Sequence, residues 1–355
     1  MKGIELFIRQ VKFNCDISDA KFWGYYSICG LLMRYRDLYR SEHSLMPWDS
    51  IRHDEISNWI HGRESLWKEL EFRELQRLII EGHAFGPFDV NSINAALQES
   101  GLIYGAGYGI FHKPTFFVAE LENVLELYDY RVYSAGRELC RDLAAAPAML
   151  QGRCIYLRPD VISSFLWDRF EEMKSNRGGC FAEEVFSMYD IRRGDVHATE
   201  LFGKIRHMTS DAVGIFLLHE TGEAYEDIYS EDWHEILSCG CDKATELYLR
   251  GIKDIRADTS VMGPLKKIIE TGDSRGLYLF LTFMDGIRRE LFPEFRDAFQ
   301  RFPASGTWSV LEEARKSGYA RVDAFQSAIV SVWRREKGSA AVAGCVRELL
   351  GKKRS

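Results

Sequence analysis

Proline and long apolar segments are both scarce in this chain of 355 residues. Only 8 residues are proline, which argues against a proline-rich stalk or linker. The longest apolar runs lie near 213–218 and 277–284, far short of the roughly 20 residues that a membrane-spanning helix needs. The opening residues, Met1 to Glu5, lack the apolar core and small-residue cleavage site of a signal peptide. We therefore expect a soluble protein that does not bind or enter a membrane.

An excess of basic residues is also missing. The chain has 46 Lys and Arg against 53 Asp and Glu, for a formal net charge of −7. This balance does not favour nucleic acid or an anionic membrane surface as a partner. The eight cysteines are dispersed, and no secretory signal accompanies them, so they are expected to be reduced thiols. The expected location is the cytoplasm.

No complete catalytic motif is present. The sequence lacks a G-x-S-x-G elbow, a Walker loop, a haem-attachment motif and an EF-hand loop. A zincin motif would need histidine at position 223, where Glu223 stands. The Glu-x-x-His pairing of di-iron bundles is not met either, because His219 precedes Glu223 and the spacing is four. The motifs therefore name no reaction.

Aromatic residues and helical periodicity are abundant. Aromatics make up 13% of the chain, enough to supply a well-filled core. Apolar residues recur at helical spacing and are bounded by capping and breaking residues. In the first part the pattern predicts helices over 20–40 (capped within 14–19), 54–80, 90–99 and 136–144. Further on it predicts helices over 160–174, 181–190, 195–208, 211–227, 231–238, 242–256, 262–271, 276–292, 308–316, 322–336 and 339–350.

Strand signals concentrate between about 103 and 135. Aromatic and β-branched residues there predict a small antiparallel β-hairpin that turns at Glu122 and Asn123. The segment 145–152 is the candidate domain boundary. The expected fold is mainly α: an N-terminal α+β unit over 1–150 that contains the hairpin, followed by an all-helical domain over 151–355.

Five phrases of the sequence point to a known family. They are Tyr26–Arg34, Tyr104–Gly109, Leu218–Glu223, Lys253–Thr259 and Asp285–Glu294, and they span most of the chain. With these phrases the chain resembles an uncharacterised bacterial family of conserved hypothetical proteins. The resemblance implies two consecutive domains of unknown function, in agreement with the boundary above. It implies no activity and no catalytic residues.

Ionisable residues in the second half suggest a metal site. At helical spacing His219 and Glu223 share one face, and Asp254 and Asp258 form a second pair of this kind. Asp285 follows the apolar run 277–284 and would need a cation if buried. Together these five residues are adequate for one or two ions of iron, manganese or zinc. Ordinary ion pairs explain each residue singly, so both interpretations stay open.

A second charged group lies near the N-terminus. Arg34, Arg36 and Arg40 stand at the end of a predicted helix and form a candidate anion-binding group. A solvated helix end, where basic residues complement the helix dipole, is the alternative.

Two classes of function follow from these observations. The first is a soluble cytoplasmic helical protein that acts without catalysis by binding a protein partner, forming a homo-oligomer or organising an assembly. The high aromatic content and the lack of a complete catalytic motif favour it slightly. The second is a metal-dependent enzyme with its site in the C-terminal helical domain. In that enzyme the metal would activate water or oxygen, and Glu220 would be the candidate base.

Overall fold

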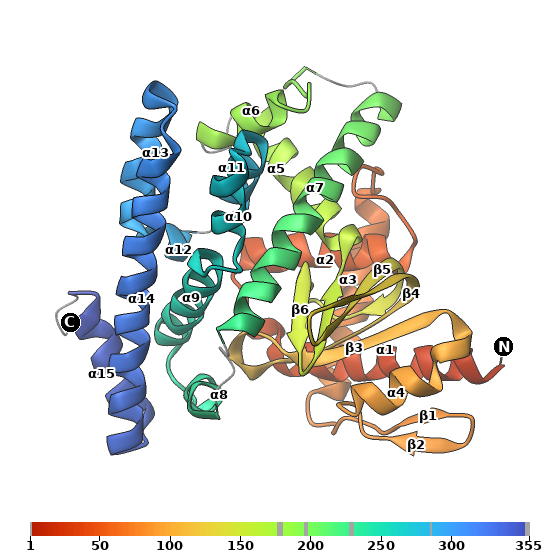
Figure 1. Ribbon diagram of the computed structural model, residues 1–355. Helices are drawn as coiled ribbons and strands as arrows, with labels where there is room; N and C mark the ends of the chain where they lie inside the picture. The colour runs from red at the N-terminus through yellow and green to blue at the C-terminus, as the bar shows by residue number, and fades with distance from the viewer. Residues whose placement is uncertain (1, 176–179, 195–197, 227–230, 285, 352–355) are drawn as a thin grey trace. The chain divides into compact units, whose positions relative to one another are not determined.

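A computed structural model describes residues 2–175, 180–194, 198–226, 231–284 and 286–351 (Figure 1). The chain divides into two compact units. The N-terminal unit comprises Met1–Gly109 and Lys113–Asp168, and the C-terminal unit comprises Ile110–His112 and Arg169–Ser355. A domain boundary near residue 150 stays a prediction. Among the described residues, no helix combines the length and apolar character that crossing a membrane requires.

Three helices open the N-terminal unit: α1 (Lys2–Phe22), α2 (Ile28–Glu42) and α3 (His53–Leu70). The predicted cap at 14–19 is wrong, because those residues lie inside α1. The predicted helix over 20–40 is interrupted, since α1 ends at Phe22 and a 3₁₀ turn at Trp23–Tyr25 follows. Ser27 then caps α2 by accepting a hydrogen bond of 3.2 Å from the amide of Gly30.

The segment after α3 was also predicted wrongly as helix. Leu78–Ile80 forms strand β1, which pairs with β2 (His83–Phe85) in a two-stranded antiparallel sheet. Glu81 and Gly82 both have positive φ, at 48° and 81°, as a tight hairpin turn requires. Helix α4 (Val90–Ala96) follows within the predicted range.

A five-stranded sheet forms the centre of the N-terminal unit, so the predicted single hairpin was too small. Its strands are β3 (Leu102–Tyr108), β4 (Pro114–Leu127), β5 (Tyr130–Arg141), β6 (Ala148–Gln151) and β7 (Cys154–Leu157). Their order is β3-β4-β5-β7-β6, and every neighbouring pair is antiparallel except β5 and β7, which are parallel.

Two details of the predicted hairpin are wrong. Strand β4 continues past Asn123 to Leu127, and the turn lies at Tyr128, whose φ is +53°. The segment 136–144 is not a helix, because β5 extends to Arg141. The cross-strand pair of Val118 with Cys140 shows the reason: pairing with β4 overrides a local sequence that would also suit a helix.

The glycines of β3 serve packing. Gly105 lies opposite Phe117 in the β3–β4 register. A Cβ atom at position 105 would lie 2.0 Å from the Phe117 ring, so only glycine leaves space for that ring.

Helix α1 packs on β4 and β5 (Figure 1). Its residues that face the sheet form a buried stripe. Phe7, Val11 and Cys15 are spaced four residues apart, as one face of a helix requires, and all three belong to the sheet's core cluster. Ile17 and Ala20 lie in a second cluster with residues of α2 and α3. The sheet-facing stripe continues toward Asp19, a position that matters below.

The C-terminal unit is helical throughout its described residues, apart from connecting segments. Helix α5 (Pro159–Lys174) begins in the N-terminal unit and ends in this one. The other helices are α6 (Cys180–Ser187), α7 (Ala198–Tyr225), α8 (Glu231–Ser238), α9 (Lys243–Thr259), α10 (Pro264–Thr271), α11 (Ser274–Phe283), α12 (Gly286–Leu291), α13 (Pro293–Ser305), α14 (Trp308–Glu336) and α15 (Ser339–Leu349).

The predicted helices of this unit differ from the observed ones in four respects. Of the predicted helices 195–208 and 211–227, residues 198–208 and 211–225 belong to the continuous helix α7, while 195–197 and 227 lie outside the described residues. The segments 308–316 and 322–336 belong to α14. The segment 276–292 contains two helices, α11 and α12, and helix α13 was missed.

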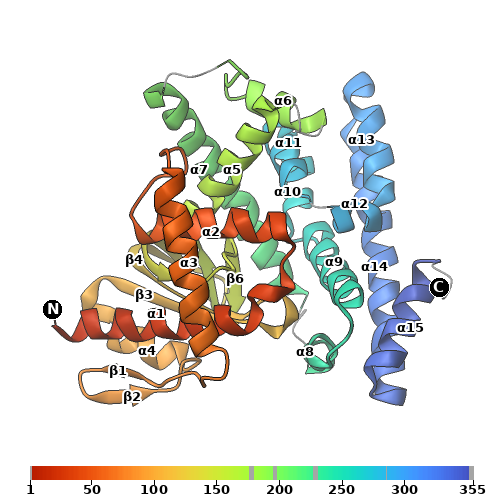
Figure 2. The same cartoon turned by 180° about the vertical axis from the view of Figure 1, so that it is seen from behind.

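Helix α9 contacts six other helices of the C-terminal unit. It packs against α7, α8, α10, α12, α14 and α15, and Figures 1 and 2 both draw it between α7 and α14. Ten of its residues are buried, among them Leu249, Ile252 and Ile255. Polar side chains on α9 are therefore drawn into a protein interior, where they need partners.

Candidate metal centre and buried charge clusters

Helices α7 and α9 approach each other closely beside the predicted metal residues. A Cβ atom on Gly222 would lie 2.4 Å from the carbonyl oxygen of Ala257, so glycine is required at this crossing. The close approach brings His219, one turn before Gly222, within reach of Asp258, the residue after Ala257.

His219 contacts carboxylates through both ring nitrogens. Its Nδ1 lies 2.7 Å from Oδ1 of Asp258, and its Nε2 lies 3.3 Å from Oε1 of Glu223. The predicted partnership of His219 and Glu223 at a spacing of four is therefore present. The contact with Asp258 fixes the orientation of the ring, as carboxylates do for histidines that bind metals.

Two cations share these carboxylates. The ammonium of Lys253, on α9, forms an ion pair with Glu223 and lies 3.5 Å from Oδ1 of Asp254. Arg288, on α12, lies 3.4 Å from Oδ2 of Asp258. We call this set, together with Glu220 and His219, the His219 cluster. The contacts above join these residues into one ionic network.

Burial and neighbouring charges separate the pKa values of this cluster. Burial lowers the pKa of His219, but the carboxylates of Asp258 and Glu223 outweigh burial and hold that pKa well above its usual value. Burial and the charge of Glu223 raise the pKa of Glu220 to about 8. Burial opposes ionisation of Glu223, yet Lys253 and His219 hold its pKa well below the usual range. Groups with pKa values driven apart in this way are typical of acid–base sites.

Three side chains of the cluster can converge on one ion. The ligand atoms of His219, Glu223 and Asp254 all lie within 4.8 Å of one another. Asp258 is occupied by His219 and Arg288, which places it behind the site. Asp285, the fifth predicted ligand, lies outside the described residues. Glu220 is buried beside Glu223 on the same helix, at 6% exposure.

The three predicted anion-binding arginines all act on the charge of Asp37 but differ in burial and contacts. Arg34 donates to the carbonyl oxygen of Leu143 at 3.1 Å and stacks over the ring of Tyr26. Arg36 is exposed, and Arg40 is buried. Arg34 and Arg36 lie on different sides of α2 because they are two residues apart, whereas Arg36 and Arg40 are one turn apart on the same side. Arg40 lines a cavity that is described below.

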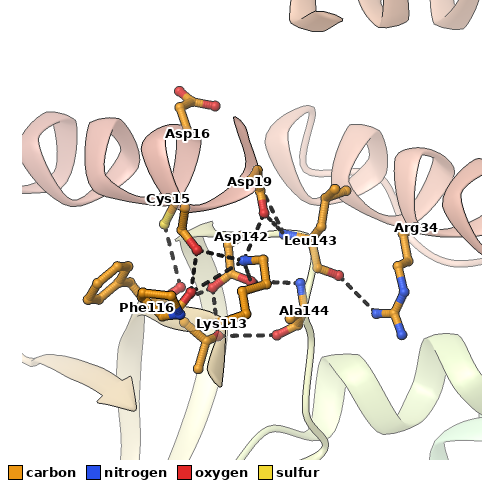
Figure 3. A network of polar contacts seen from close by, with 12 residues as sticks. Cys15, Asp16, Asp19, Arg34, Lys113, Phe116, Asp142, Leu143 and Ala144 are labelled. Carbon is orange, nitrogen blue, oxygen red and sulfur yellow. Dashed lines mark hydrogen bonds and ion pairs between the residues drawn. The ribbon is translucent and has the colours of Figure 1, made fainter. Parts of the chain in front are cut away.

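A second charge cluster, in the N-terminal unit, was missed by sequence reasoning (Figure 3). The ammonium of Lys113 lies 2.9 Å from Oδ1 of Asp19 and 3.0 Å from Oδ1 of Asp142. It also donates to Ser18 at 2.9 Å. All four side chains are buried, and those of Lys113 and the two aspartates are 1–2% exposed. We call these residues the Lys113 cluster.

Backbone amides complete the coordination of both aspartates in the Lys113 cluster. Asp142 accepts from the amides of Phe116 (2.7 Å) and Ala144 (2.6 Å) and from the hydroxyl of Thr115 (2.6 Å). Asp19 accepts from the amide of Leu143 at 3.1 and 3.2 Å. The cluster therefore joins α1 to the start of β4 and to the segment after β5.

One lysine cannot neutralise two buried carboxylates. Accordingly, burial raises the pKa of Asp19 to about 7 against the opposing effect of Lys113. Burial opposes ionisation of Asp142, but Lys113, Thr115 and the amide of Phe116 hold its pKa below the usual value. The stripe of α1 offered a signal for this site, since Asp19 lies one turn beyond Cys15 on the same buried face.

Comparisons with known proteins identify the family. A model of a family of unknown function, DUF6866, matches twice: its N-terminal domain over residues 6–158 and its C-terminal domain over residues 163–352. The chain belongs to this family. The expectation of two consecutive domains of unknown function is thus confirmed. Neither a curated protein nor a solved structure matches the chain.

Proposed function

We propose that the C-terminal unit binds a divalent metal ion through His219, Glu223 and Asp254. The supporting observation is the arrangement of His219, whose Nδ1 faces Asp258 while its Nε2 faces Glu223. A carboxylate behind a histidine fixes the orientation of the ring, so that Nε2 can bind a metal once the metal displaces its proton. One nitrogen and two carboxylate oxygens suit iron, manganese or zinc, and three protein ligands leave a position for water.

Lys253 competes with the metal ion in this proposal. Its ammonium forms an ion pair with Glu223, one of the proposed ligands. Metal and ammonium therefore compete for one carboxylate, and binding requires the flexible lysine side chain to move. Glu220, with its raised pKa, would then lose its proton more readily, because a nearby metal charge favours the carboxylate. On this proposal the protein is a metal-dependent enzyme in which the metal would activate water and Glu220 would act as the base.

Metal content and affinity test this proposal directly. Protein purified without a histidine tag and treated with chelator is titrated with Mn²⁺, Fe²⁺ or Zn²⁺ in a calorimeter. We expect one ion per chain, loss of binding in His219→Ala, and tighter binding in Lys253→Met, which removes the competing cation.

The chain supplies a matched control for that experiment. His207 and Asp211 form another histidine–carboxylate pair at spacing four on α7, but the side chain of His207 is 61% exposed. His207→Ala should leave metal binding unchanged. Equal losses in the two histidine variants, or no binding by the wild-type protein, would refute the proposed site.

A second candidate function is self-association in the cytoplasm without catalysis. The observation that favours it is a run of exposed apolar side chains along the 3₁₀ turn and α2. Exposure of Ile28 reaches 81%, and Leu32 is 49% exposed one turn later, with Trp23, Tyr25 and Met33 nearby. Exposed apolar groups gathered in this way are typical of interaction surfaces.

Light scattering coupled to gel filtration tests this second candidate. We expect an oligomer that dissociates in the double variant Ile28→Ser/Leu32→Ser. A monomeric wild-type protein across the micromolar range would rule out self-association through this surface.

A further inference from the structure

The N-terminal unit contains a cavity of about 110 Å³ that is separate from both charge clusters. It lies where the end of α2, the end of β5 and the first turns of α5 meet. Its lining includes three arginines, Arg40, Arg137 and Arg141, together with four serines and the apolar residues Leu45 to Pro47. A lining rich in arginine and hydroxyl groups provides many hydrogen-bond donors.

Arg40 is the most unusual residue of this cavity. It is only 7% exposed, and its buried Nε has no hydrogen-bond partner. The nearest carboxylate oxygen, Oδ1 of Asp37, lies 3.8 Å from its terminal nitrogen, beyond hydrogen-bond range. Burial and the charge of Arg36 lower the pKa of Arg40, in keeping with a charge that is incompletely compensated. A buried guanidinium with an unused donor is costly unless an acceptor reaches it.

The other charged groups of the lining already have partners. Glu138 accepts from Arg158 at 2.6 Å and lies 3.4 Å from Nε of Arg141. Arg137 pairs at 2.7 Å with Glu120, outside the cavity. Burial raises the pKa values of both Asp37 and Asp160. Arg40 has three carboxylates in its electrostatic surroundings, Asp37, Asp49 and Asp168. Its ion pair, at 3.8 Å, is nevertheless longer than those of Arg137 and Arg141, at 2.7 and 3.4 Å.

We propose that this cavity binds a small oxyanion, a carboxylate or a phosphate group, with the Arg40 guanidinium as its principal contact. An oxyanion placed there would accept the unused Nε–H of Arg40, and charge-assisted bonds of this kind are strong and directional. The hydroxyls of Ser41 and Ser44, which line the same wall, would supply further donors. This site is independent of the metal site proposed above, because all of its lining residues belong to the N-terminal unit.

Nuclear magnetic resonance of the arginine side chains provides the test. The full-length protein labelled with ¹⁵N is titrated with inorganic phosphate and, separately, with acetate, at constant ionic strength set with chloride. We expect the Nε–H signal of Arg40, assigned with Arg40→Lys, to shift in a saturable manner with one of the two ions. The ion that binds more tightly identifies the phosphate or the carboxylate source.

Two variants separate a specific site from general surface charge. Arg40→Lys keeps the positive charge but removes the Nε donor, so we expect at least a tenfold loss of affinity. Arg36→Lys alters the exposed arginine one turn earlier on the same helix and should retain wild-type affinity. The proposal is overturned if neither ion shifts the Arg40 signal, or if both variants bind as the wild type does.

Discussion

The two buried charge clusters of this protein use similar groups in different ways. In the Lys113 cluster, backbone amides of Phe116, Leu143 and Ala144 hold the two aspartates in place. These amides are available because they belong to strand ends and an irregular segment. The cluster is sealed, with side chains of Lys113, Asp19 and Asp142 only 1–2% exposed.

In the His219 cluster the contacts described above join side chains on three helices. Backbone amides inside a helix are already used by the helix itself, so they cannot hold these carboxylates. The side chains of His219 and Asp254 are 16% and 27% exposed. The comparison separates carboxylates held by backbone amides from carboxylates held only by side chains, and the metal proposal requires the second kind to exchange partners.

The largest expected difference between the clusters concerns their lysines. Lys113→Met should lower the free energy of unfolding by about 3–5 kcal/mol, because it leaves buried carboxylates without their cation. Lys253→Met should cost less, about 1–3 kcal/mol, since His219 still contacts Glu223. Urea denaturation followed by circular dichroism measures both values. Equal losses would show that the two clusters do not differ in rigidity.

The next largest effect concerns one aspartate from each cluster. Asp142→Asn should lower the free energy of unfolding by about 2–3 kcal/mol, because an amide nitrogen would face N–H donors. Asp258→Asn should instead act mainly on metal binding, with a loss of about 10–100-fold in affinity, because the orientation of His219 would be less fixed. Denaturation and calorimetric titration of both variants check this division. A reversed pattern would contradict it.

The free energy of unfolding should depend on pH through Asp19, because one lysine cannot neutralise both aspartates of the Lys113 cluster. The pKa of Asp19 is raised to about 7 from an ordinary 3.8, so its contribution to stability is complete at low pH and is lost as pH rises toward 7. Relative to Asp19→Asn, the wild-type protein should lose up to about 1.4 kcal/mol per pH unit between roughly pH 4 and 7. Urea midpoints measured across this range in the presence of chelator test it. Parallel curves for the two proteins would show that Asp19 titrates normally.

The smallest expected effect is that of a single hydroxyl. Thr115→Val removes the hydroxyl that donates a hydrogen bond of 2.6 Å to the buried Asp142. The substitution should lower the free energy of unfolding by about 1 kcal/mol. Thr271→Val provides the matched control, because Thr271 is exposed and donates to the carbonyl of Lys267 within its own helix. We expect the control to change the free energy of unfolding by less than about 0.5 kcal/mol.

Helical periodicity was a good guide where helices pack on helices. Most predicted helices of the C-terminal unit are present, because their apolar spacing reflects burial along one face. It failed where strand pairing competed with it. Residues 136–141 have a sequence that suits a helix, but their hydrogen bonds go to β4. Such pairing depends on residues up to 24 positions away, such as Arg141 with Phe117, which a local pattern does not contain.

The candidate sites also differ in how much of each could be predicted from local sequence. The spacing of His219 and Glu223 on one helix was enough to predict that they share a face. The approach of Asp254 and Asp258 was a hypothesis that needed the crossing of α7 and α9 at Gly222. The stripe of α1 pointed to Asp19 alone. Its partners Lys113 and Asp142 could not be predicted, because they are far away in the sequence and belong to no known motif.

By itself, the sequence determined the helical character of the second half of the chain, the pairing of His219 with Glu223, and the absence of familiar catalytic motifs. These properties depend on residue types and on spacings within a few turns of helix. Tertiary structure alone decided the five-stranded sheet, the partners of Lys113 and the unpaired Nε of Arg40. The physical reason is that burial and hydrogen bonding between distant segments determine which charges are neutralised and which still require a ligand.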